Sequence, residues 1–369
     1  MRKILFTLSL FIFSLLSASA DTPLKKIFGK NFLIGAAIND RQVSGKDGAV
    51  ATKCIITNFN SVVAENCMKP EVVHPKQNVW RWDKADAFVN FGTKNKMAVI
   101  GHCLVWHQQT PQWFFKDKDG KEVSRDTLIQ RMKDHIFTVM GRYKGRIKGW
   151  DVVNEAFNDD GSYRESPWYN IIGPEYIEMA LRFAHEADPK AELYINDFNM
   201  FCVGKRRAVC RLVRRLKEKG VQLDAIGMQS HNGMKYPNLV EYEKSIEAFG
   251  KTGLKVMVTE LDLNILPQPK GFGGGAEITD NFKYNPEDDP YRNGLTPEMD
   301  KFVNQRWIDL FNIYHRHKDV ISRVCLWGVT DAQSWMNDWP VKGRTAYPLL
   351  FDRDYKQKPV VREIEKIFK

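Results

Sequence analysis

Short apolar runs alternate with longer amphipathic stretches along most of the chain. Eight of these runs are rich in β-branched and other apolar residues, which is typical of strands buried on both faces; they span residues 32–38, 61–66, 97–106, 149–156, 192–199, 225–231, 255–263 and 324–332. Between them, apolar positions recur at helical spacing, as in Tyr176, Ile177, Ala180, Leu181 and Ala184, or Val303, Trp307, Leu310, Phe311 and Tyr314. The pattern predicts strands that alternate with helices.

Eight such strands, each followed by a helix, predict an α/β fold in which a parallel sheet closes as a (β/α)8 TIM barrel. A doubly wound open sheet is the alternative, but the first strand-to-helix turn lacks its glycine-rich phosphate fingerprint. We expect one domain over residues 21–369. Residues 264–299 are too rich in Gly and Pro for a helix. We predict an elaborated loop there, after the seventh strand and on the active face.

The first residues have the pattern of an export signal. Arg2 and Lys3 precede an apolar run, and Ala18, Ser19 and Ala20 supply the small residues of a cleavage site. A membrane anchor is the alternative, although the apolar run is short for a span. We expect residues 1–20 to be a signal peptide, removed near Asp21. The mature protein would then be secreted or periplasmic, without a membrane association.

Charge and cysteine content change this picture little. The formal net charge of +10 falls by two when Arg2 and Lys3 are removed. Basic residues in 205–220 alternate with apolar ones at helical spacing, which favours a solvated helix face over a nucleic-acid site. None of the six cysteines has zinc-site spacing. We expect buried free thiols, no cofactor and a monomer, and leave a Cys202–Cys210 bond open.

Polar side chains gather where the predicted strands end. Carboxylates, amides, histidines and tryptophans follow seven of the eight strands, among them Glu65, Asn66, Lys69, His102, Trp106, Gln109, Asn154, Glu155, Gln229, His231, Glu260, Trp327 and Trp335. Catalytic groups of such barrels lie at this end of the strands. Burying polar groups costs several kcal/mol unless they are satisfied. The concentration therefore predicts a site for a polyhydroxylated ligand, in which tryptophans stack on sugar rings.

Two of these residues suit the hydrolysis of a glycosidic bond. Glu155 and Glu260 end the fourth and seventh strands, so their carboxyl groups can converge across the barrel mouth. Glycoside hydrolysis needs such a pair, one protonated as the acid and one ionised. We expect His231 to donate a hydrogen bond to Glu260 and Asn154 to bind a sugar hydroxyl. A metal site at His102 and His107 is disfavoured because no HExxH helix is present.

Seven motifs together resemble glycoside hydrolase family 10, the endo-β-1,4-xylanases. In order along the chain they are AENCMK (64–69), GHCLVWHQQ (101–109), WDVVNE (150–155), NDFN (196–199), MQSH (228–231), TELD (259–262) and LWGVTDAQSW (326–335). The resemblance implies retaining hydrolysis, with Glu155 as acid/base and Glu260 as nucleophile. It also implies that the other polar and aromatic strand-end residues named above bind xylan on the glycone side, with Trp106, Trp327 and Trp335 around the central sugar.

Two positions depart from the family pattern. Phe198 stands where tyrosine is frequent, and Met336 where arginine often follows the last tryptophan. Both affect expected contacts with sugar, not the chemistry. The alternatives for function are a related β-1,4-glucanase or mannanase and an inactive carbohydrate-binding barrel. The presence of both Glu155 and Glu260 disfavours the last, because binding alone requires neither.

Overall fold

Eight parallel strands form a closed barrel. The computed structural model describes residues 21–272 and 279–369. The strands lie in the order β6-β5-β4-β3-β2-β1-β9-β8, and β6 also pairs with β8, which closes the ring. Their bounds are β1 Leu33–Ile38, β2 Ser61–Ala64, β3 Ala98–Val105, β4 Gly149–Asn154, β5 Glu192–Asp197, β6 Ala225–Met228, β8 Lys255–Asn264 and β9 Ile321–Leu326. The predicted (β/α)8 barrel is confirmed.

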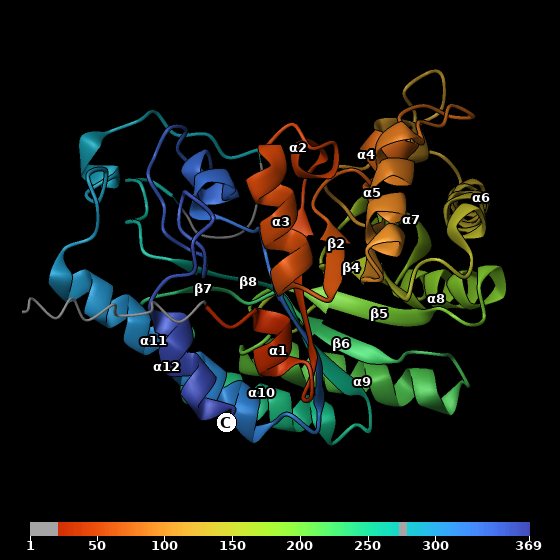
Figure 1. Cartoon of the computed structure of the whole chain (residues 1–369). Helices are drawn as coiled ribbons and strands as arrows, with labels where there is room; N and C mark the ends of the chain where they lie inside the picture. The colour runs from red at the N-terminus through yellow and green to blue at the C-terminus, as the bar shows by residue number, and fades with distance from the viewer. Residues whose placement is uncertain (1–20, 273–278) are drawn as a thin grey trace, which may run out of the picture.

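Helices surround the barrel (Figure 1). The longer ones are α3 Gly48–Asn58, α5 Asp83–Lys94, α6 Arg125–Tyr143, α8 Tyr176–Ala187, α9 Val203–Glu218, α10 Leu239–Gly250, α11 Pro297–Arg316 and α12 Val360–Ile367. Shorter ones are α1 Leu24–Phe28, α2 Asp40–Val43, α4 Pro70–Val73 and α7 Pro167–Ile172. The apolar positions predicted for α8 and α11 are all buried, as their spacing requires.

The hydrophobic core has two parts. The larger lies between the strands and the helices and includes the buried faces of α8, α9 and α11. The smaller fills the barrel itself with side chains from alternate strand positions, namely Ala37, Val63, Ile100, Tyr194, Ala225, Met257 and Cys325. Gly149 makes room for the largest of them, because a Cβ there would lie 2.2 Å from the Tyr194 hydroxyl. The barrel is therefore packed, and a ligand must bind at one of its ends.

Two predicted strands differ from the observed ones by more than two residues at an end. The predicted strand 225–231 is interrupted, because Ser230 has a left-handed backbone (φ +63°). It continues as a short strand, β7 (His231–Gly233), that pairs with the end of β8. The predicted strand 324–332 starts earlier, at Ile321, and ends at Leu326, after which a 3₁₀ turn covers Asp331–Gln333. Gln229 and His231 beside the first interruption, and Trp327 and Trp335 after β9, line the cavity at the barrel mouth.

The predicted solvated face of α9 is wrong at Lys205. This side chain is fully buried, and its Nζ lies 3.0 Å from Asp197 Oδ1 and 3.1 Å from Asp159 Oδ1. Other cations of the helix, such as Arg207 and Arg214, are exposed as expected. The spacing of basic residues along a helix cannot show that one of them, Lys205, contacts carboxylates from the segment after β4 and from the end of β5.

The remaining segments test other expectations. The predicted signal peptide, residues 1–20, lies outside the described residues, as do residues 273–278 of the predicted loop. The rest of 264–299 connects β8 to α11 with a single 3₁₀ turn, Pro286–Asp288. All six cysteines are free, including Cys202 and Cys210. Within the described ranges, no helix has the length and apolar character needed to cross a bilayer.

Candidate active site

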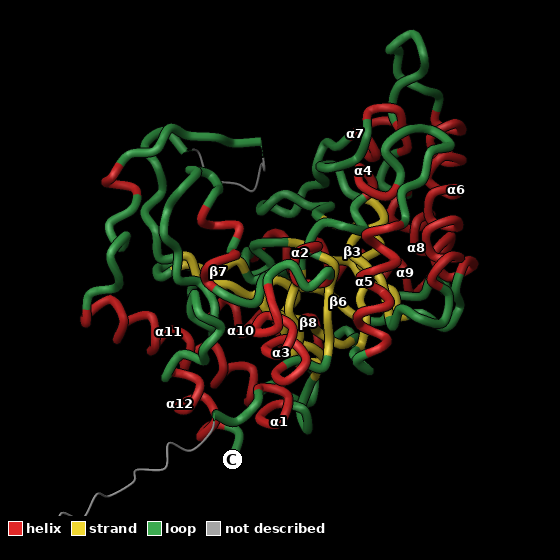
Figure 2. The backbone as a smooth tube through the Cα atoms, turned by 45° about the horizontal axis from the view of Figure 1, so that its top comes forward, coloured by secondary structure: helices red, strands yellow, loops and turns green. Residues whose placement is uncertain are grey.

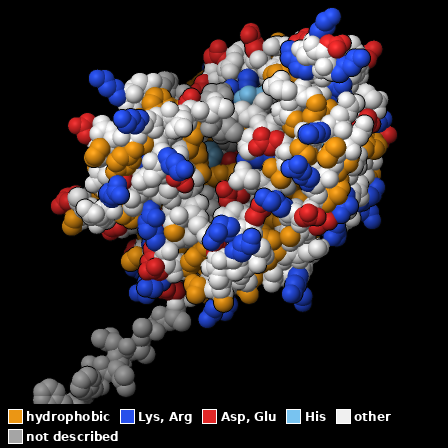
Figure 3. Space-filling view, turned by 90° about the horizontal axis from the view of Figure 1, so that it is seen from above, with side chains coloured by type: hydrophobic (Ala, Val, Ile, Leu, Met, Phe, Trp, Pro, Cys, Tyr) orange, Lys and Arg blue, Asp and Glu red, His pale blue; other side chains and the backbone are white. Residues whose placement is uncertain are grey.

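All of the predicted site residues line one cavity at the carboxyl ends of the strands. The cavity has a volume of about 280 Å³, and Trp339 completes its lining. Viewed from above, the surface is hollowed at this place, and histidine side chains show inside the hollow (Figure 3). The barrel therefore brings together side chains that are separated by nearly the whole length of the chain, from Glu65 to Trp335.

Glu155 leaves the end of β4 through a strained backbone. Its φ is +58°, in the left-handed region that side chains other than glycine rarely adopt, and its N–H donates to Asn196 O over 2.8 Å. The carboxylate accepts hydrogen bonds from Trp106 Nε1 (2.9 Å) and Gln229 Nε2 (3.0 Å). Burial raises the pKa of Glu155 and outweighs these hydrogen bonds, which lower it. Its surroundings therefore favour the protonated acid.

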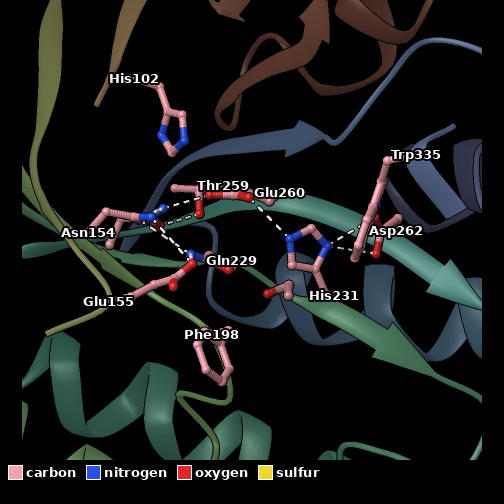
Figure 4. Close-up of polar contacts among 12 residues, drawn as sticks. His102, Asn154, Glu155, Phe198, Gln229, His231, Thr259, Glu260, Asp262 and Trp335 are labelled. Atoms are coloured by element: carbon pink, nitrogen blue, oxygen red, sulfur yellow. Dashed lines mark hydrogen bonds and ion pairs between the residues drawn. The ribbon is translucent and has the colours of Figure 1, made fainter. Parts of the chain in front are cut away.

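Glu260, on β8, has the opposite electrostatic surroundings. Its Oε1 accepts from Asn196 Nδ2 over 2.6 Å, and its Oε2 lies 3.1 Å from His231 Nε2. Burial acts to raise the pKa of Glu260, but the hydrogen bond from His231 and the charges of the nearby histidines outweigh it and lower the pKa. The predicted hydrogen bond between His231 and Glu260 is present (Figure 4). Glu260 is thus held as a carboxylate.

His231 is itself held by Asp262. The His231 Nδ1 lies 2.9 Å from Asp262 Oδ2, which also accepts from Trp335 Nε1 over 2.8 Å. Although burial lowers the pKa of His231, Asp262 and Glu260 raise it to about 10. Figure 4 shows the ring between the two carboxylates. At neutral pH the imidazolium donates from both nitrogens, so this chain of contacts fixes the orientation and the charge of Glu260.

The opposite edge of the cavity carries hydrogen-bonding groups for hydroxyls. Lys69 donates to Asn66 Oδ1 (2.8 Å) and Gln109 Oε1 (2.6 Å), and its Nζ lies 5.2 Å from the centre of the Trp106 ring. Burial lowers the pKa of Lys69. His102 Nδ1 lies 2.9 Å from Asp151 Oδ2, which orients the ring. Aromatic rings beside such donors suit a sugar, whose faces are apolar and whose edges are polar.

Some functional positions were missed from the sequence. Asn196 donates to both Asn154 Oδ1 (2.9 Å) and Glu260, and accepts from Thr259 (2.6 Å), so it links β4 to β8. Its place at the end of β5 was the available signal. Trp339 also lines the cavity, but it lies beyond the last motif and nothing in the sequence marks it.

Other residues have supporting roles in the structure. Asp197, at the end of β5, accepts from the backbone of Phe157 and from Lys205. Trp113 is outside the cavity lining and packs against His74 and Phe114. His107 also lies outside it and contacts the Trp106 ring edge-on. These contacts give Trp113 and His107 a structural place beside the site.

A second cavity adjoins the first. It has a volume of about 410 Å³, shares His231, Trp335 and Trp339 with the first cavity, and continues along the loop after β8. The two residues that depart from the family pattern, Phe198 and Met336, both line it. Both departures from the family pattern therefore lie in this neighbouring cavity, and neither belongs to the lining around Glu155 and Glu260.

Known proteins are similar to this chain in sequence and in fold. The model of a family described as glycosyl hydrolase family 10 matches residues 23–367. The chain is 54% identical to endo-1,4-β-xylanase A of Xylanibacter ruminicola, over 100% of both chains. An endoxylanase structure from a sugarcane soil metagenome has a TM-score of 0.89 and 43% identity, covering 93% of this chain and 99% of its own. A variant of an intracellular xylanase of Thermoanaerobacterium saccharolyticum, solved with xylotriose, has a TM-score of 0.80 and 34% identity, with 94% and 99% covered.

Proposed function

Because the chain belongs to glycosyl hydrolase family 10, we propose that it cleaves internal β-1,4 bonds of xylan by double displacement, with Glu155 as acid/base and Glu260 as nucleophile. It is an endo-1,4-β-xylanase, as are its relatives over the full length of the chain. The residue roles rest on one observation. Two buried glutamates border the same cavity, and their surroundings shift their pKa values in opposite directions.

In the first step Glu260 attacks the anomeric carbon while Glu155 gives its proton to the departing glycosidic oxygen. The bond to the leaving sugar breaks, and an ester forms between Glu260 and the glycone. The hydrogen bonds from His231 and Asn196 keep the nucleophile ionised and aimed. Burial raises the pKa of Glu155, so this side chain carries a proton that it can transfer to the leaving oxygen.

In the second step water replaces the leaving sugar. Glu155, now ionised, takes a proton from this water, whose oxygen attacks the anomeric carbon and releases Glu260. Two inversions restore the original β configuration. The Gln229 and Trp106 hydrogen bonds stabilise Glu155 in its ionised form, so the same side chain serves as acid and then as base.

The two roles can be separated by chemical rescue. We expect Glu260→Ala to lose at least ~10³-fold in kcat, because no covalent intermediate can form and removal of a nucleophile has effects of this size or larger. Azide added to Glu260→Ala should give the α-glycosyl azide from an aryl xylobioside, by one inversion. Azide added to Glu155→Ala should give the β-azide, by capture of the covalent intermediate. Exchanged products would reverse the two assignments, and wild-type rates in Glu260→Ala would refute the mechanism.

The substrate preference has a separate test. Xylan, cellulose and mannan should be compared under the same conditions, with the configuration of the first product followed by NMR. We expect xylan to be cleaved fastest, since Trp327 and Trp335 border the central cavity and xylose has no hydroxymethyl group to pass them. Faster cleavage of cellulose or mannan would reject this preference, and an α product would reject retention.

The proposal also covers the predicted signal peptide and the oligomeric state. The basic start, apolar run and small residues of 1–20 support export and removal of this segment, so the active enzyme would be secreted or periplasmic. We also propose that it acts as a monomer, since the cavity is formed by one chain. Mass spectrometry of the exported protein should find an N-terminus near Asp21. An uncleaved chain in the cytoplasmic fraction would contradict this.

A further inference from the structure

The end of the barrel opposite the active site contains a buried cation without a partner. Arg323, at the start of β9, is 2% exposed. Its Nε, Nη1 and Nη2 atoms have no hydrogen-bond acceptor anywhere in residues 21–272 or 279–369. The centre of the Tyr194 ring lies 5.7 Å from the guanidinium carbon of Arg323. An unpaired buried charge is costly, because the interior cannot replace the water that it loses.

This guanidinium borders a cavity in the barrel floor. The cavity has a volume of about 590 Å³, and its lining comes from the first residues of several strands, including Leu33, Ala98, Ala225 and Ser322. The charged groups that face it besides Arg323 are Lys148, Glu192, Asp224 and Lys255. The Tyr194 layer and Cys325 separate this floor from the active-site mouth. The two cavities share no lining residue.

The carboxylates that line this floor cavity already have partners. Glu192 accepts from Lys148 and, over 2.6 Å, from the Tyr194 hydroxyl. Asp224 Oδ2 accepts from Leu193 N and from Gln222 Nε2, each over 2.7 Å. The charge of Lys148 is thereby paired with that of Glu192. Lys255 uses one proton for Asp319 O, 2.8 Å away, which leaves two of its three N–H donors. The charged groups of this cavity that are not paired with a carboxylate of the described residues are therefore the cations Arg323 and Lys255.

We infer that the barrel floor binds a small oxyanion, a phosphate or a carboxylate, between Arg323 and Lys255. A guanidinium presents its five N–H donors in a planar fork that matches two oxygens of one oxyanion. The site is a second ligand site, independent of xylan hydrolysis. Its ligand would stabilise the fold by neutralising Arg323, since a ligand bound only to the folded state shifts the unfolding equilibrium.

Inorganic phosphate is the probe for this site. Calorimetric titration of the full chain, in a Tris-chloride buffer without other oxyanions, should give saturable binding of about one phosphate. Arg323→Met should weaken it by about tenfold or more, the loss expected for charge-assisted hydrogen bonds. Acetate should compete with phosphate if the site takes oxyanions in general. Absence of saturable phosphate binding to the wild-type protein would overturn the inference.

Two surface variants decide the question even where Arg323→Met does not fold. Lys255→Met removes the second cation and should weaken phosphate binding severalfold. Glu192→Gln frees Lys148 and removes a negative charge, so it should tighten binding. Lys118→Met, on an exposed loop away from this cavity, loses the same charge as Lys255→Met and should leave phosphate affinity unchanged. Equal affinities in all three variants would overturn the site, and xylanase activity should stay constant throughout.

Discussion

At the scale of single residues, the contacts of His231 determine how the site responds to pH. The imidazolium lies between Glu260 and Asp262, and its positive charge contributes to the low pKa of the nucleophile. In the proposed mechanism Glu260 must be ionised to attack, so a lowered pKa would keep the enzyme active at lower pH. Glu155 must be protonated, so its raised pKa sustains activity toward higher pH. The two shifts together widen the pH range of hydrolysis.

Replacement of His231 by glutamine tests this assignment. Glutamine keeps an N–H donor but carries no charge, so the pKa of Glu260 should rise. The acid limb of the kcat/KM profile should then move to higher pH by about one unit, the shift typical of losing one nearby opposite charge. The alkaline limb, which reports Glu155, is the internal control and should move less. An unchanged acid limb would mean that His231 does not set the ionisation of Glu260.

At the scale of elements, Lys205 connects α9 to the end of β5. Its ammonium contacts Asp197, whose carboxylate also accepts from the backbone N–H groups of Phe157 (3.1 Å) and Phe198 (2.9 Å). One buried ion pair thus holds the segment after β4, which carries Glu155, and the segment after β5, which carries Phe198. The Lys205 Nζ also lies 4.1 Å from the centre of the Phe198 ring.

Removal of one partner should be more harmful than removal of both. Lys205→Met leaves Asp197 as an uncompensated buried charge, so we expect the free energy of unfolding to fall by about 3–5 kcal/mol. Lys205→Met combined with Asp197→Asn should recover part of that loss, because the charge is then gone. Urea unfolding of the single and double variants measures the coupling. Additive losses would show that the two side chains do not stabilise each other.

A pair of buried histidines connects α4 to α6. His74, which follows α4, and His135, on α6, lie with their Nδ1 atoms 3.2 Å apart, in contact with Trp80 and Phe114. Burial lowers the pKa of His74 to about 4 and that of His135 to about 3. Both rings are neutral in the folded protein at pH 5, whereas an unfolded histidine titrates near 6.5.

Acid should therefore destabilise the fold through this pair. Between pH 6.5 and the folded pKa values the unfolded chain binds more protons, so stability falls as the pH falls. From pH 6.5 to 5 the loss from His135 alone is about 2 kcal/mol, at 1.36 kcal/mol per pH unit. Urea unfolding at pH 5 and 7 measures it, and the pH dependence should shrink in His135→Gln. Equal pH dependence in both proteins would exclude His135 as the source.

The same elements show what a sequence can predict. Glu155 and Glu260 were found because strand ends meet at one rim, so a position along a strand suffices to place them. Asn196 has an equally clear position, yet its role depends on hydrogen bonds to two other strands. Lys205 was misplaced because its partners come from distant segments. The break at Ser230 was missed because no glycine marks this left-handed backbone.

At the scale of the whole molecule, barrel closure joins the first strand to the last. β1 pairs with β9. The flanking helices α1 and α12 also contact each other, because the ring of Phe28 in α1 lies 4.8 Å, centre to centre, from the ring of Phe368, which follows α12. Thr22 donates to Glu365 over 3.1 Å, and Arg362 lies 3.0 Å from Asp21. Figures 1 and 2 show these segments side by side, below the strands and away from the active-site rim.

We therefore predict that the order of the strands along the chain can be changed without changing the barrel. A circular permutant that joins Lys369 to Asp21 through a short linker, and opens the chain in the exposed turn at Gly120, would keep every strand pairing. We expect it to fold and to hydrolyse xylan with a kcat near that of the parent, which product assays and urea unfolding would check. Loss of folding would mean that the native order of synthesis is needed to form the barrel. Because the segment that ends at Lys369 lies away from the rim, a tether from Lys369 to a solid support would leave the active-site cavity facing the polymer.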